Sequence, residues 1–391
     1  MGIDKTSKLY TVLFLTKWYP NRTDLQLGVF VQKHAKAVSQ LNWNVILLYV
    51  YSDSGLNTIY ELNQQTNNGF LEVVICYKKS NSPFRFFLNS YRYLNSYVMG
   101  FKALNKKTKH INLIHVNILN RPGIIALFLN KIKGIPYIIT EHWGGYITGD
   151  FAKLNFIKKW TTKLIISNAK ALTVVSSVLK NKMQELGLTN NYTIVPNIIE
   201  QIAVSDENTI IDSKIKILTI ADLVDNIKNV SGIIKAIAAI SINNSTFEYH
   251  IIGDGPDKGP LIKLSDSLNL TNRIVFFHGK QANEFVYNFL QKINFVIINS
   301  NSETFSIVAA EALACGKPVI TTTCGGPQEF ITADQGILIP PNDSVQLKEA
   351  IKNMLLNFKK YSPKKLSNYA AEKFSYEKVG AQFIEVYNKL F

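Results

Sequence analysis

The sequence predicts an α/β protein built from two doubly wound domains. Short apolar runs rich in β-branched and aromatic residues alternate with segments of helical length, as in a parallel sheet covered by helices. The alternation stops in a polar stretch and starts again at Lys216. The chain has 391 residues, which is enough for two hydrophobic cores at roughly 100 to 200 residues per domain.

Each apolar run is short and is bounded by polar residues or glycine, which is typical of a buried strand. In the first half we expect strands at residues 10–15, 44–51, 72–77, 113–116, 137–140, 172–175 and 192–195. In the second half we expect them at residues 216–220, 248–252, 274–277, 295–298, 318–321 and 336–339. Helices are expected between them, the first starting after Gly28-Val29-Phe30-Val31.

These two series predict an N-terminal domain at residues 1–200 and a C-terminal domain at residues 201–373. The polar stretch 201–213 is the expected connection. Ligands of open α/β sheets bind outside the carboxyl ends of the strands. We therefore expect the domains to face each other across a cleft in which each holds one substrate.

The composition excludes disordered, fibrous and membrane-spanning chains. Hydrophobic residues make up 47% and charged residues 18%, far more buriable surface than a disordered chain has. Apolar runs such as 123–129 fall well short of the roughly 18 residues that a transmembrane helix needs. The N-terminus shows no small-residue cleavage site, and Cys76, Cys315 and Cys324 form no paired motif. We expect a cytoplasmic protein, with the inner face of the plasma membrane as a further location.

The formal net charge of +15 lies entirely in the first half. Residues 1–200 hold 24 basic and 9 acidic residues, whereas residues 201–391 hold 19 of each. This asymmetry favours a basic surface facing an anionic membrane, with a generally basic surface as the alternative. Neither zinc-finger spacing nor an RNA-binding aromatic signature accompanies the charge, so nucleic acid is not expected as a partner.

Two lysine-rich segments hold much of this charge. The first contains Lys102, Lys106, Lys107 and Lys109, and the second contains Lys153, Lys158, Lys159, Lys163 and Lys170. Apolar residues alternate with the second group of lysines at near-helical spacing. They are Phe151, Leu154, Phe156, Ile157, Trp160, Leu164 and Ile165. The stripe predicts either a membrane-surface helix or an amphipathic helix packed into its own domain.

The most informative segment runs from residue 299 to residue 318. A buried strand ends near Ile298, polar residues follow, and Ala-rich helical sequence stops at Gly316. Glu311 comes eight residues after Glu303, so Glu303 is expected in the loop and Glu311 two turns down the helix. The free N–H groups and the dipole of that helix N-terminus suit a phosphate group.

Two Glu residues at this spacing and in this setting resemble the retaining GT-B glycosyltransferases of family 4. The resemblance implies that Glu303 contacts the donor sugar and that Glu311 binds the ribose hydroxyls of a nucleotide sugar. The amides of Phe305 and Ser306 would hold the diphosphate, with Thr304 and Ile307 beside them. Family members often have Gly where Ser306 stands.

Further motifs extend the resemblance to a GT-B fold over nearly the whole chain. Tyr19 and Gly28 are similar to the loop that closes over the acceptor, and Thr140-Glu141-His142-Trp143 looks like the loop beside the donor sugar, with His142 catalytic and Trp143 on the acceptor side. Val195-Pro196-Asn197 matches the hinge. Gly253 and Gly279 are placed in the donor site, and residues 374–391 are identified as the helix that completes the first domain. His115 is expected in the core.

One position departs from the family. Donor sites usually carry an Arg and a Lys directed at the diphosphate, and Lys228 is present, but Asp222 occupies the Arg position. Lys228 and the helix N-terminus would therefore have to neutralise the negative charge of the diphosphate without the help of an Arg. No Asp-x-Asp motif occurs, so the resemblance implies an enzyme without a metal or other cofactor.

The expected activity is retaining transfer of a sugar from a UDP- or GDP-sugar to a glycan or lipid-linked glycan, in bacterial surface polysaccharide biosynthesis. Three alternatives stay open: a nucleotide-sugar 2-epimerase of the same architecture, an inactive sugar-nucleotide-binding subunit, and a periplasmic-type binding protein. Turnover of the donor separates the enzymes from the binding proteins. A requirement for an acceptor separates the transferase from the epimerase.

Overall fold

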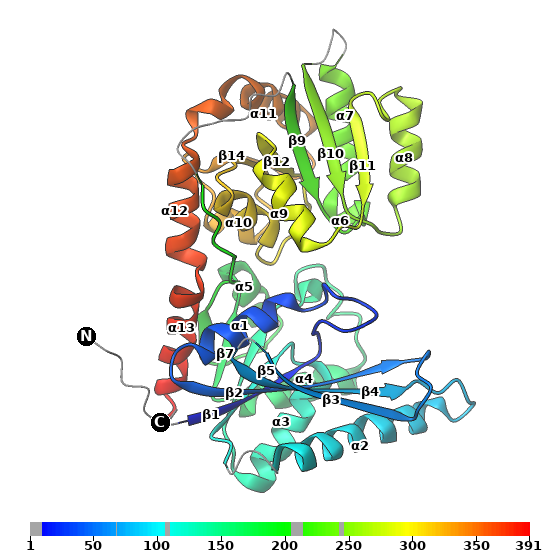
Figure 1. Ribbon diagram of the computed structural model, residues 1–391, viewed down its shortest axis with the longest axis vertical. Helices are drawn as coiled ribbons and strands as arrows, with labels where there is room; N and C mark the ends of the chain where they lie inside the picture. Colours follow the sequence, from blue (N-terminus) through cyan, green and yellow to red (C-terminus); the bar gives the residue numbers. More distant parts are fainter. Residues whose placement is uncertain (1–9, 68, 106–109, 205–213, 242–245) are drawn as a thin grey trace. The chain divides into compact units, whose positions relative to one another are not determined.

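The computed structural model describes residues 10–67, 69–105, 110–204, 214–241 and 246–391, which form two units (Figure 1). The first unit comprises the described residues up to Val175, Leu179–Ile198 and Tyr376–Phe391. The second comprises Ser176–Val178 and the described part of Ile199–Ser375. Lys106, Lys107, Lys109 and positions 205–213 of the expected connection lie outside the described residues.

In the described part of the first unit, eight strands form one sheet in the order β3-β4-β2-β1-β5-β6-β7-β8. Neighbouring strands are parallel except for the antiparallel pair β3 and β4. The strands are β1 (Tyr10–Thr16), β2 (Trp43–Asp53), β3 (Tyr60–Asn67), β4 (Phe70–Lys78), β5 (Leu113–Asn117), β6 (Tyr137–Glu141), β7 (Ala171–Val174) and β8 (Tyr192–Ile194).

Every strand expected in this half is present, and β3 is an addition. It was missed because its residues are mostly polar and exposed, so it has no apolar face for a sequence pattern to reveal. Its place at the sheet edge comes from backbone pairing with β4.

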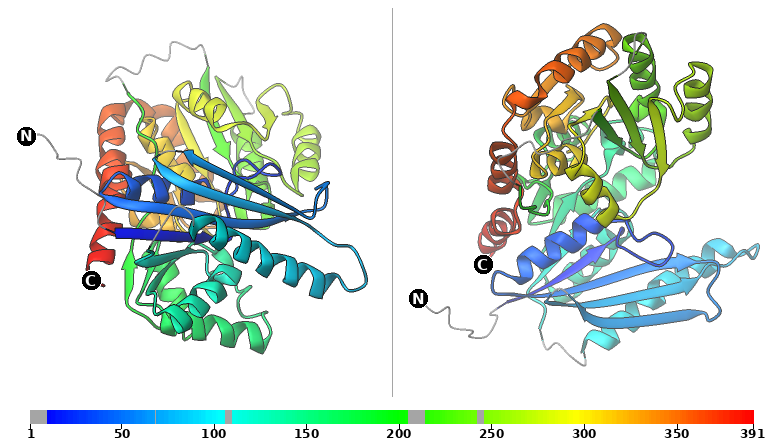
Figure 2. Two further views of the ribbon diagram at one scale, coloured as in Figure 1. Left: turned by 60° about the horizontal axis from the view of Figure 1, so that its bottom comes forward. Right: turned by 45° about the horizontal axis from the view of Figure 1, so that its top comes forward.

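Helices cover both faces of this sheet (Figures 1 and 2). They are α1 (Val29–Ser39), α2 (Arg85–Asn105), α3 (Asn120–Lys133), α4 (Phe156–Asn168), α5 (Ser177–Glu185) and α13 (Tyr376–Asn388), with the short turn η1 (Gly144–Tyr146). Helices α1 and α13 pack together over one core, to which Val379, Phe383 and Tyr387 of α13 contribute. Helix α1 begins at Val29, earlier than expected, because Gly28 takes the left-handed cap conformation with φ 67°.

The described part of the second unit contains a six-stranded parallel sheet in the order β11-β10-β9-β12-β13-β14. The strands are β9 (Ile215–Ile220), β10 (Phe247–Ile252), β11 (Val275–Gly279), β12 (Phe295–Ile298), β13 (Val319–Thr322) and β14 (Gly336–Ile339). The helices are α6 (Asp225–Lys228), α7 (Val230–Ile240), α8 (Lys258–Ser267), α9 (Asn283–Gln291), α10 (Ile307–Ala314), α11 (Ser344–Asn357) and α12 (Pro363–Phe374), with the turns η2 (Gly326–Glu329) and η3 (Phe358–Lys360).

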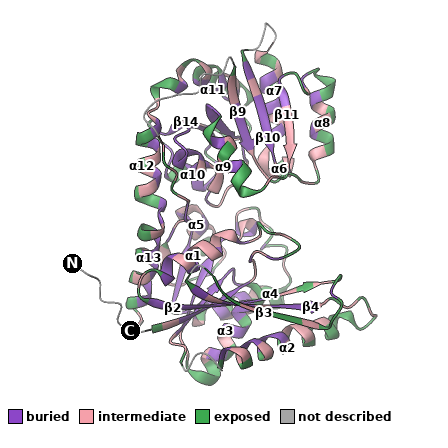
Figure 3. Cartoon of the chain, in the orientation of Figure 1, coloured by how far each residue is buried: buried purple, intermediate pink, exposed green. Residues whose placement is uncertain are grey.

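This strand order places a topological switch between β9 and β12. From β9 the chain continues to β10 and β11 on one side of the sheet, and from β12 it continues to β13 and β14 on the other. The loops after β9 and β12 therefore emerge side by side, and such a switch point is where doubly wound sheets bind their ligands. The core beneath is apolar, with Phe295 and Ile297 of β12 fully buried. The buried strands and the more exposed outer helix surfaces are visible in Figure 3.

Candidate active site

In the second unit, the structure brings Lys228 and Glu303 into direct contact. Lys228 is the last residue of α6, and its Nζ donates to Glu303 Oε1 at 2.7 Å. Ser300 Oγ donates to the same oxygen at 2.8 Å. Both Lys228 and Glu303 keep part of their side chains open to solvent, 23% and 13%. Solvent can therefore reach both side chains of the pair.

The backbone of Glu303 is fixed by the loop after β13. Its N–H donates to the carbonyl of Cys324, and its own carbonyl accepts from Gly326 N–H at 3.0 Å. A Cβ at Gly325 would lie 2.3 Å from the carbonyl oxygen of Glu303. Only glycine therefore allows the loop after β13 to approach the loop after β12 this closely.

Helix α10 starts directly after this loop, with Ser306 as its N-cap residue. Ser306 has φ 71° and ψ 78°, a left-handed conformation that favours glycine. The side chain of Phe305 is buried against Phe330 and Phe374, which leaves its backbone as the part available to a ligand. Thr304 and Ile307, on either side, are half-buried.

Glu311 lies on α10 and is held by Tyr287 of α9, whose hydroxyl donates to Glu311 Oε1 at 2.7 Å. Burial and the neighbouring carboxylate raise the pKa of Tyr287, so the phenol stays a proton donor. Because α10 begins at Ile307, Glu311 lies little more than one turn into the helix. The expectation of two turns was wrong, since the polar loop extends to Ser306.

The glycines expected in the donor site are also brought together. Gly253 N–H donates to the carbonyl of Gly279 at 2.9 Å. Gly253 has φ 148°, and a Cβ there would lie 1.9 Å from the carbonyl oxygen of Ala221. The turn after β10 can thus approach the loop after β9 closely. Asp222, in that same loop, is exposed.

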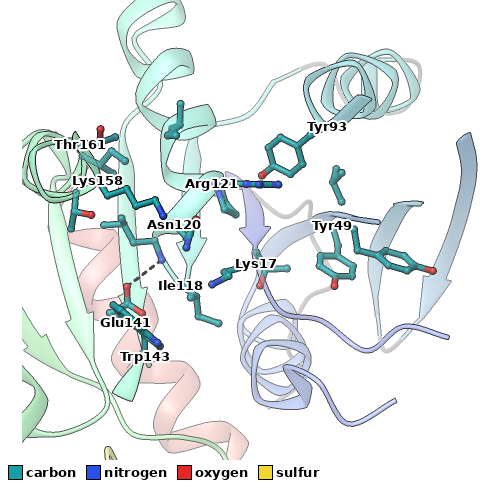
Figure 4. A pocket seen from close by; sticks show the side chains of 18 of the residues that line it. Lys17, Tyr49, Tyr93, Ile118, Asn120, Arg121, Glu141, Trp143, Lys158 and Thr161 are labelled. Atoms are coloured by element: carbon teal, nitrogen blue, oxygen red, sulfur yellow. Dashed lines mark hydrogen bonds between the residues drawn. The ribbon is translucent and has the colours of Figure 1, made fainter. Parts of the chain in front are cut away.

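The first unit contains a cavity of about 850 Å³ at the carboxyl ends of its central strands. Figure 4 shows the side chains around it, with Lys17 following β1, Asn120 and Arg121 on α3, and Lys158 on α4. Trp143, expected on the acceptor side, lines this cavity, and a Cβ at Gly145 would clash with its ring at 2.1 Å.

Glu141 organises the loop that follows β6. Its Oε1 accepts from the amides of His142 and Trp143, and its Oε2 accepts from the Leu119 amide and the Tyr146 hydroxyl. Burial raises the pKa of Glu141, while these four donors oppose the shift. The Glu141 carboxylate therefore has a structural role, because its hydrogen bonds join the loop after β5 to the loop after β6.

His142 is buried beside this loop and is not among the residues that line the cavity. Its ring lies 4.3 Å from that of Phe30 and 5.6 Å from that of His34. Burial drives the pKa of His142 well below its usual value, so the ring is neutral at pH 7. Its Nε2 has no hydrogen-bond partner among the residues that the structure describes.

Tyr19 and Gly28 shape the loop after β1 without lining the cavity. Tyr19 is buried, and its hydroxyl donates to Glu72 Oε1 at 2.5 Å. A Cβ at Gly28 would lie 2.3 Å from the carbonyl oxygen of Trp18. His115 belongs to the core, as expected, where it contacts the hydroxyls of Thr140 and Tyr387.

The apolar stripe around α4 is partly buried and partly exposed. Phe151 and Ile165 are buried, so the part of the stripe nearest the sheet packs into the domain. Phe156, Ile157 and Trp160 remain exposed. Packing into the domain is therefore confirmed for the buried part of the stripe, and the membrane-surface helix stays a prediction for the exposed part.

Reasoning from sequence missed three residues of these sites. Glu141 is the last residue of β6 and precedes the predicted His142. Because ligands bind outside the carboxyl ends of parallel strands, its position could have marked it as a site residue. Arg121 and Tyr287 carry no local signal. They matter because helices distant in sequence place them at the cavity and beside Glu311.

The described residues contain neither a candidate metal cluster nor a candidate membrane-spanning helix. No group of three His, Cys, Asp or Glu side chains there is arranged to hold a metal ion. None of the helices in those ranges combines the length and the hydrophobicity that crossing a membrane requires.

Comparison with known proteins agrees with this architecture. The family model described as Glycosyltransferase Family 4 matches residues 27–201, and that of Glycosyl transferases group 1 matches residues 200–373. An uncharacterized glycosyltransferase of Methanocaldococcus jannaschii is 28% identical over 76% of this chain and 80% of its own length. The N-acetyl-alpha-D-glucosaminyl L-malate synthase of Bacillus anthracis is 26% identical over 71% of this chain and 75% of its own.

Solved structures show the same fold at lower identity. Sucrose-phosphate synthase from Thermosynechococcus elongatus is 20% identical, with a TM-score of 0.75 over 97% of this chain and 99% of its own. Anabaena HepE in complex with UDP and glucose is 15% identical, with a TM-score of 0.69 over 97% of this chain and 100% of its own.

Proposed function

The chain belongs to the GT-B glycosyltransferases of group 1 and family 4, and on that premise we propose a retaining transferase that uses a UDP- or GDP-sugar. The proposed acceptor is a hydroxyl group of a glycan or lipid-linked glycan in bacterial surface polysaccharide assembly. The synthase from Bacillus anthracis and the lipopolysaccharide core glycosyltransferase LpsD of Rhizobium meliloti, among its relatives, support transfer as the reaction class.

The contact between Lys228 and Glu303 beside the start of α10 is the observation that carries this proposal. A cation, a carboxylate and a helix N-terminus meet at the switch point of the second unit's sheet. Lys228 and the first amides of α10 suit the diphosphate, Glu303 suits the sugar hydroxyls, and Glu311 suits the ribose.

In the proposed reaction, the bond between the anomeric carbon and the diphosphate oxygen breaks, and a bond to the acceptor oxygen forms on the same face. The acceptor proton passes to the departing diphosphate. Negative charge grows on that diphosphate, and Lys228 with the α10 N-terminus stabilises it. We propose that no metal takes part, since the sequence lacks an Asp-x-Asp motif.

We assign His142 to contact with the donor sugar. Its buried Nε2 has no partner among the described residues, and an unsatisfied buried polar atom costs about 1–3 kcal/mol. A sugar hydroxyl would satisfy it once the side chains that cover this atom move aside. We further propose a cytoplasmic protein that touches the anionic inner face of the membrane, supported by the basic first half and the exposed residues of α4.

The test is a thermal-shift screen of the full chain against UDP, GDP, ADP, CMP and their sugars, with and without EDTA. One nucleotide should stabilise the protein selectively, and EDTA should not change the shift. With that donor, product should form only when an acceptor is added. Conversion of the donor without an acceptor would identify an epimerase, and binding without turnover would identify an inactive subunit.

A further inference from the structure

The cavity of the first unit offers free positive charge. Its lining includes three cations, Lys17, Arg121 and Lys158, and a single acid, Glu141. Among the residues that the structure describes, none of the three cations forms an ion pair with a carboxylate. Arg121 lies over the ring of Tyr93 at 5.3 Å, which orients its guanidinium at the cavity wall.

The one acid of the lining is already occupied. The two oxygens of Glu141 accept four hydrogen bonds from protein donors, so this carboxylate has little capacity left for a ligand hydroxyl. Burial lowers the pKa of Lys17, which means that this ammonium is partly stripped of water before any ligand arrives. A partly dehydrated cation gains most from an anion that replaces the lost water.

The positive surface extends beyond this cavity. A second hollow of about 340 Å³ shares Arg121 with it and adds Lys79 and Arg85. The guanidinium of Arg121 thus stands between two hollows that both carry cations. Several cations around two hollows that share Arg121 suit a ligand with more than one phosphate group, such as a diphosphate.

Exposed apolar side chains adjoin the cavity mouth. Ile124 of α3 and Ile157 of α4 line the cavity and are nevertheless 48% and 71% exposed. On α3, Phe128 and Ile132 continue from Ile124 at four-residue steps, which places all three on one helix face. On α4, Phe156 and Trp160 flank Ile157, and both are exposed. Contiguous exposed apolar surface marks an interaction site.

We infer that this cavity binds the phosphate or diphosphate group of a lipid-linked acceptor whose hydrocarbon chain lies across the apolar residues of α3 and α4. Half-buried Lys17 and the exposed Arg121 and Lys158 line the cavity, and exposed apolar residues line or adjoin it, which matches a ligand with a charged head and an apolar tail. The excess of basic residues in the first half also draws this surface toward an anionic bilayer. The inference rests on the proposed function for the chemistry, but binding is measurable without transfer.

The test measures binding of three probes to the full chain by calorimetry: farnesyl diphosphate, inorganic diphosphate and farnesol. Farnesyl diphosphate should bind at least about tenfold more tightly than either other probe. Arg121→Gln should weaken both diphosphates about tenfold, since charge-assisted hydrogen bonds are lost. Lys170→Gln, an exposed lysine outside the cavity, is the matched control and should change neither.

A second pair of variants tests the apolar part. Ile157→Ser should weaken farnesyl diphosphate about tenfold and leave inorganic diphosphate unchanged, since only the lipid chain contacts it. Leu356→Ser, a similarly exposed leucine of α11, is the control. Equal binding of the two diphosphates would overturn the lipid assignment in favour of a soluble phosphate.

The donor site could also bind a diphosphate, so Lys228→Ala is included. It should leave farnesyl diphosphate binding intact. Binding that is lost in Lys228→Ala and kept in Arg121→Gln would place the probe in the second unit and overturn the inference, while leaving the proposed transferase untouched. Normal probe binding in a protein that no nucleotide stabilises would instead count against the proposed function alone.

Discussion

Lys228 Nζ lies 2.7 Å from Glu303 Oε1, although the two residues are far apart in sequence. The contact joins the short helix after β9 to the loop after β12, the two segments that meet at the topological switch of the sheet. In the free protein each group neutralises the other. In the proposed reaction, a donor would replace this pairing with a phosphate on Lys228 and sugar hydroxyls on Glu303.

Replacing Lys228 with Ala should lower kcat by about 10²–10³, and by more than it raises KM. The reason is that charge on the diphosphate is largest in the transition state. Steady-state kinetics with the nucleotide sugar found in the thermal screen measure both constants. Lys235→Ala, an exposed lysine on α7, should behave as wild type. A higher KM with an unchanged kcat would contradict this role.

Replacing Glu311 with Ala should abolish stabilisation by the nucleotide. A ligand at 100 times its Kd stabilises by about 2.7 kcal/mol, which is roughly 5 to 10 °C in Tm for a domain of this size. Tyr287→Phe removes the hydroxyl that holds Glu311 and should weaken nucleotide binding only several-fold. A full nucleotide shift in Glu311→Ala would show that the ribose binds elsewhere.

Replacing Ser306 with Gly should stabilise the second unit by about 1 kcal/mol, because a left-handed conformation costs a side-chain-bearing residue about 1–2 kcal/mol. Urea denaturation followed by fluorescence measures the change. The same replacement at Ser367, inside α12, should instead destabilise, since glycine weakens an ordinary helix. Destabilisation at both positions would mean that the Ser306 side chain contributes more than its backbone costs.

Replacing Asp222 with Arg should tighten binding of the nucleoside diphosphate. Asp222 is exposed in the loop after β9, so a larger side chain can be accommodated there. Asp222→Asn removes the negative charge without adding a positive one, and it should fall between wild type and Asp222→Arg. Calorimetry with the nucleotide identified in the screen measures all three. Equal affinities would place residue 222 away from the diphosphate.

Lys317 makes stability depend on pH. It is buried, and burial lowers its pKa from 10.5 to about 8. Between those values the unfolded chain binds more protons than the folded one, so stability should rise with pH from about 8 to 10.5, by up to about 3 kcal/mol. Below pH 8 the charged form must be buried in the folded state, and the penalty is complete.

Denaturation at pH 7.5 and pH 10 measures this dependence. Lys317→Met should be more stable than wild type at pH 7.5 and should lose that advantage by pH 10. Lys292→Met, at an exposed position, should show no such crossover. A constant difference between wild type and Lys317→Met at both pH values would refute the assignment to this ammonium.

Much of the fold could be predicted because each buried strand is a continuous apolar run bounded by polar residues. The same reasoning placed Glu303 in a loop and Glu311 on a helix, since a strand, a polar loop and an Ala-rich helix occur in one segment. Strand β3 could not be found from the sequence. It has no apolar face, and backbone pairing with β4 places it in the sheet.

The sequence by itself determined the two α/β domains, the charge asymmetry and the segment that carries both glutamates, because these depend on neighbours along the chain. Only the tertiary structure decided that Lys228 meets Glu303, that Tyr287 holds Glu311, and that the α4 stripe is half exposed. It also gathered Lys17, Arg121 and Lys158 around one cavity. Such contacts join residues far apart in sequence, and they arise only when the sheets pack and their strand ends converge.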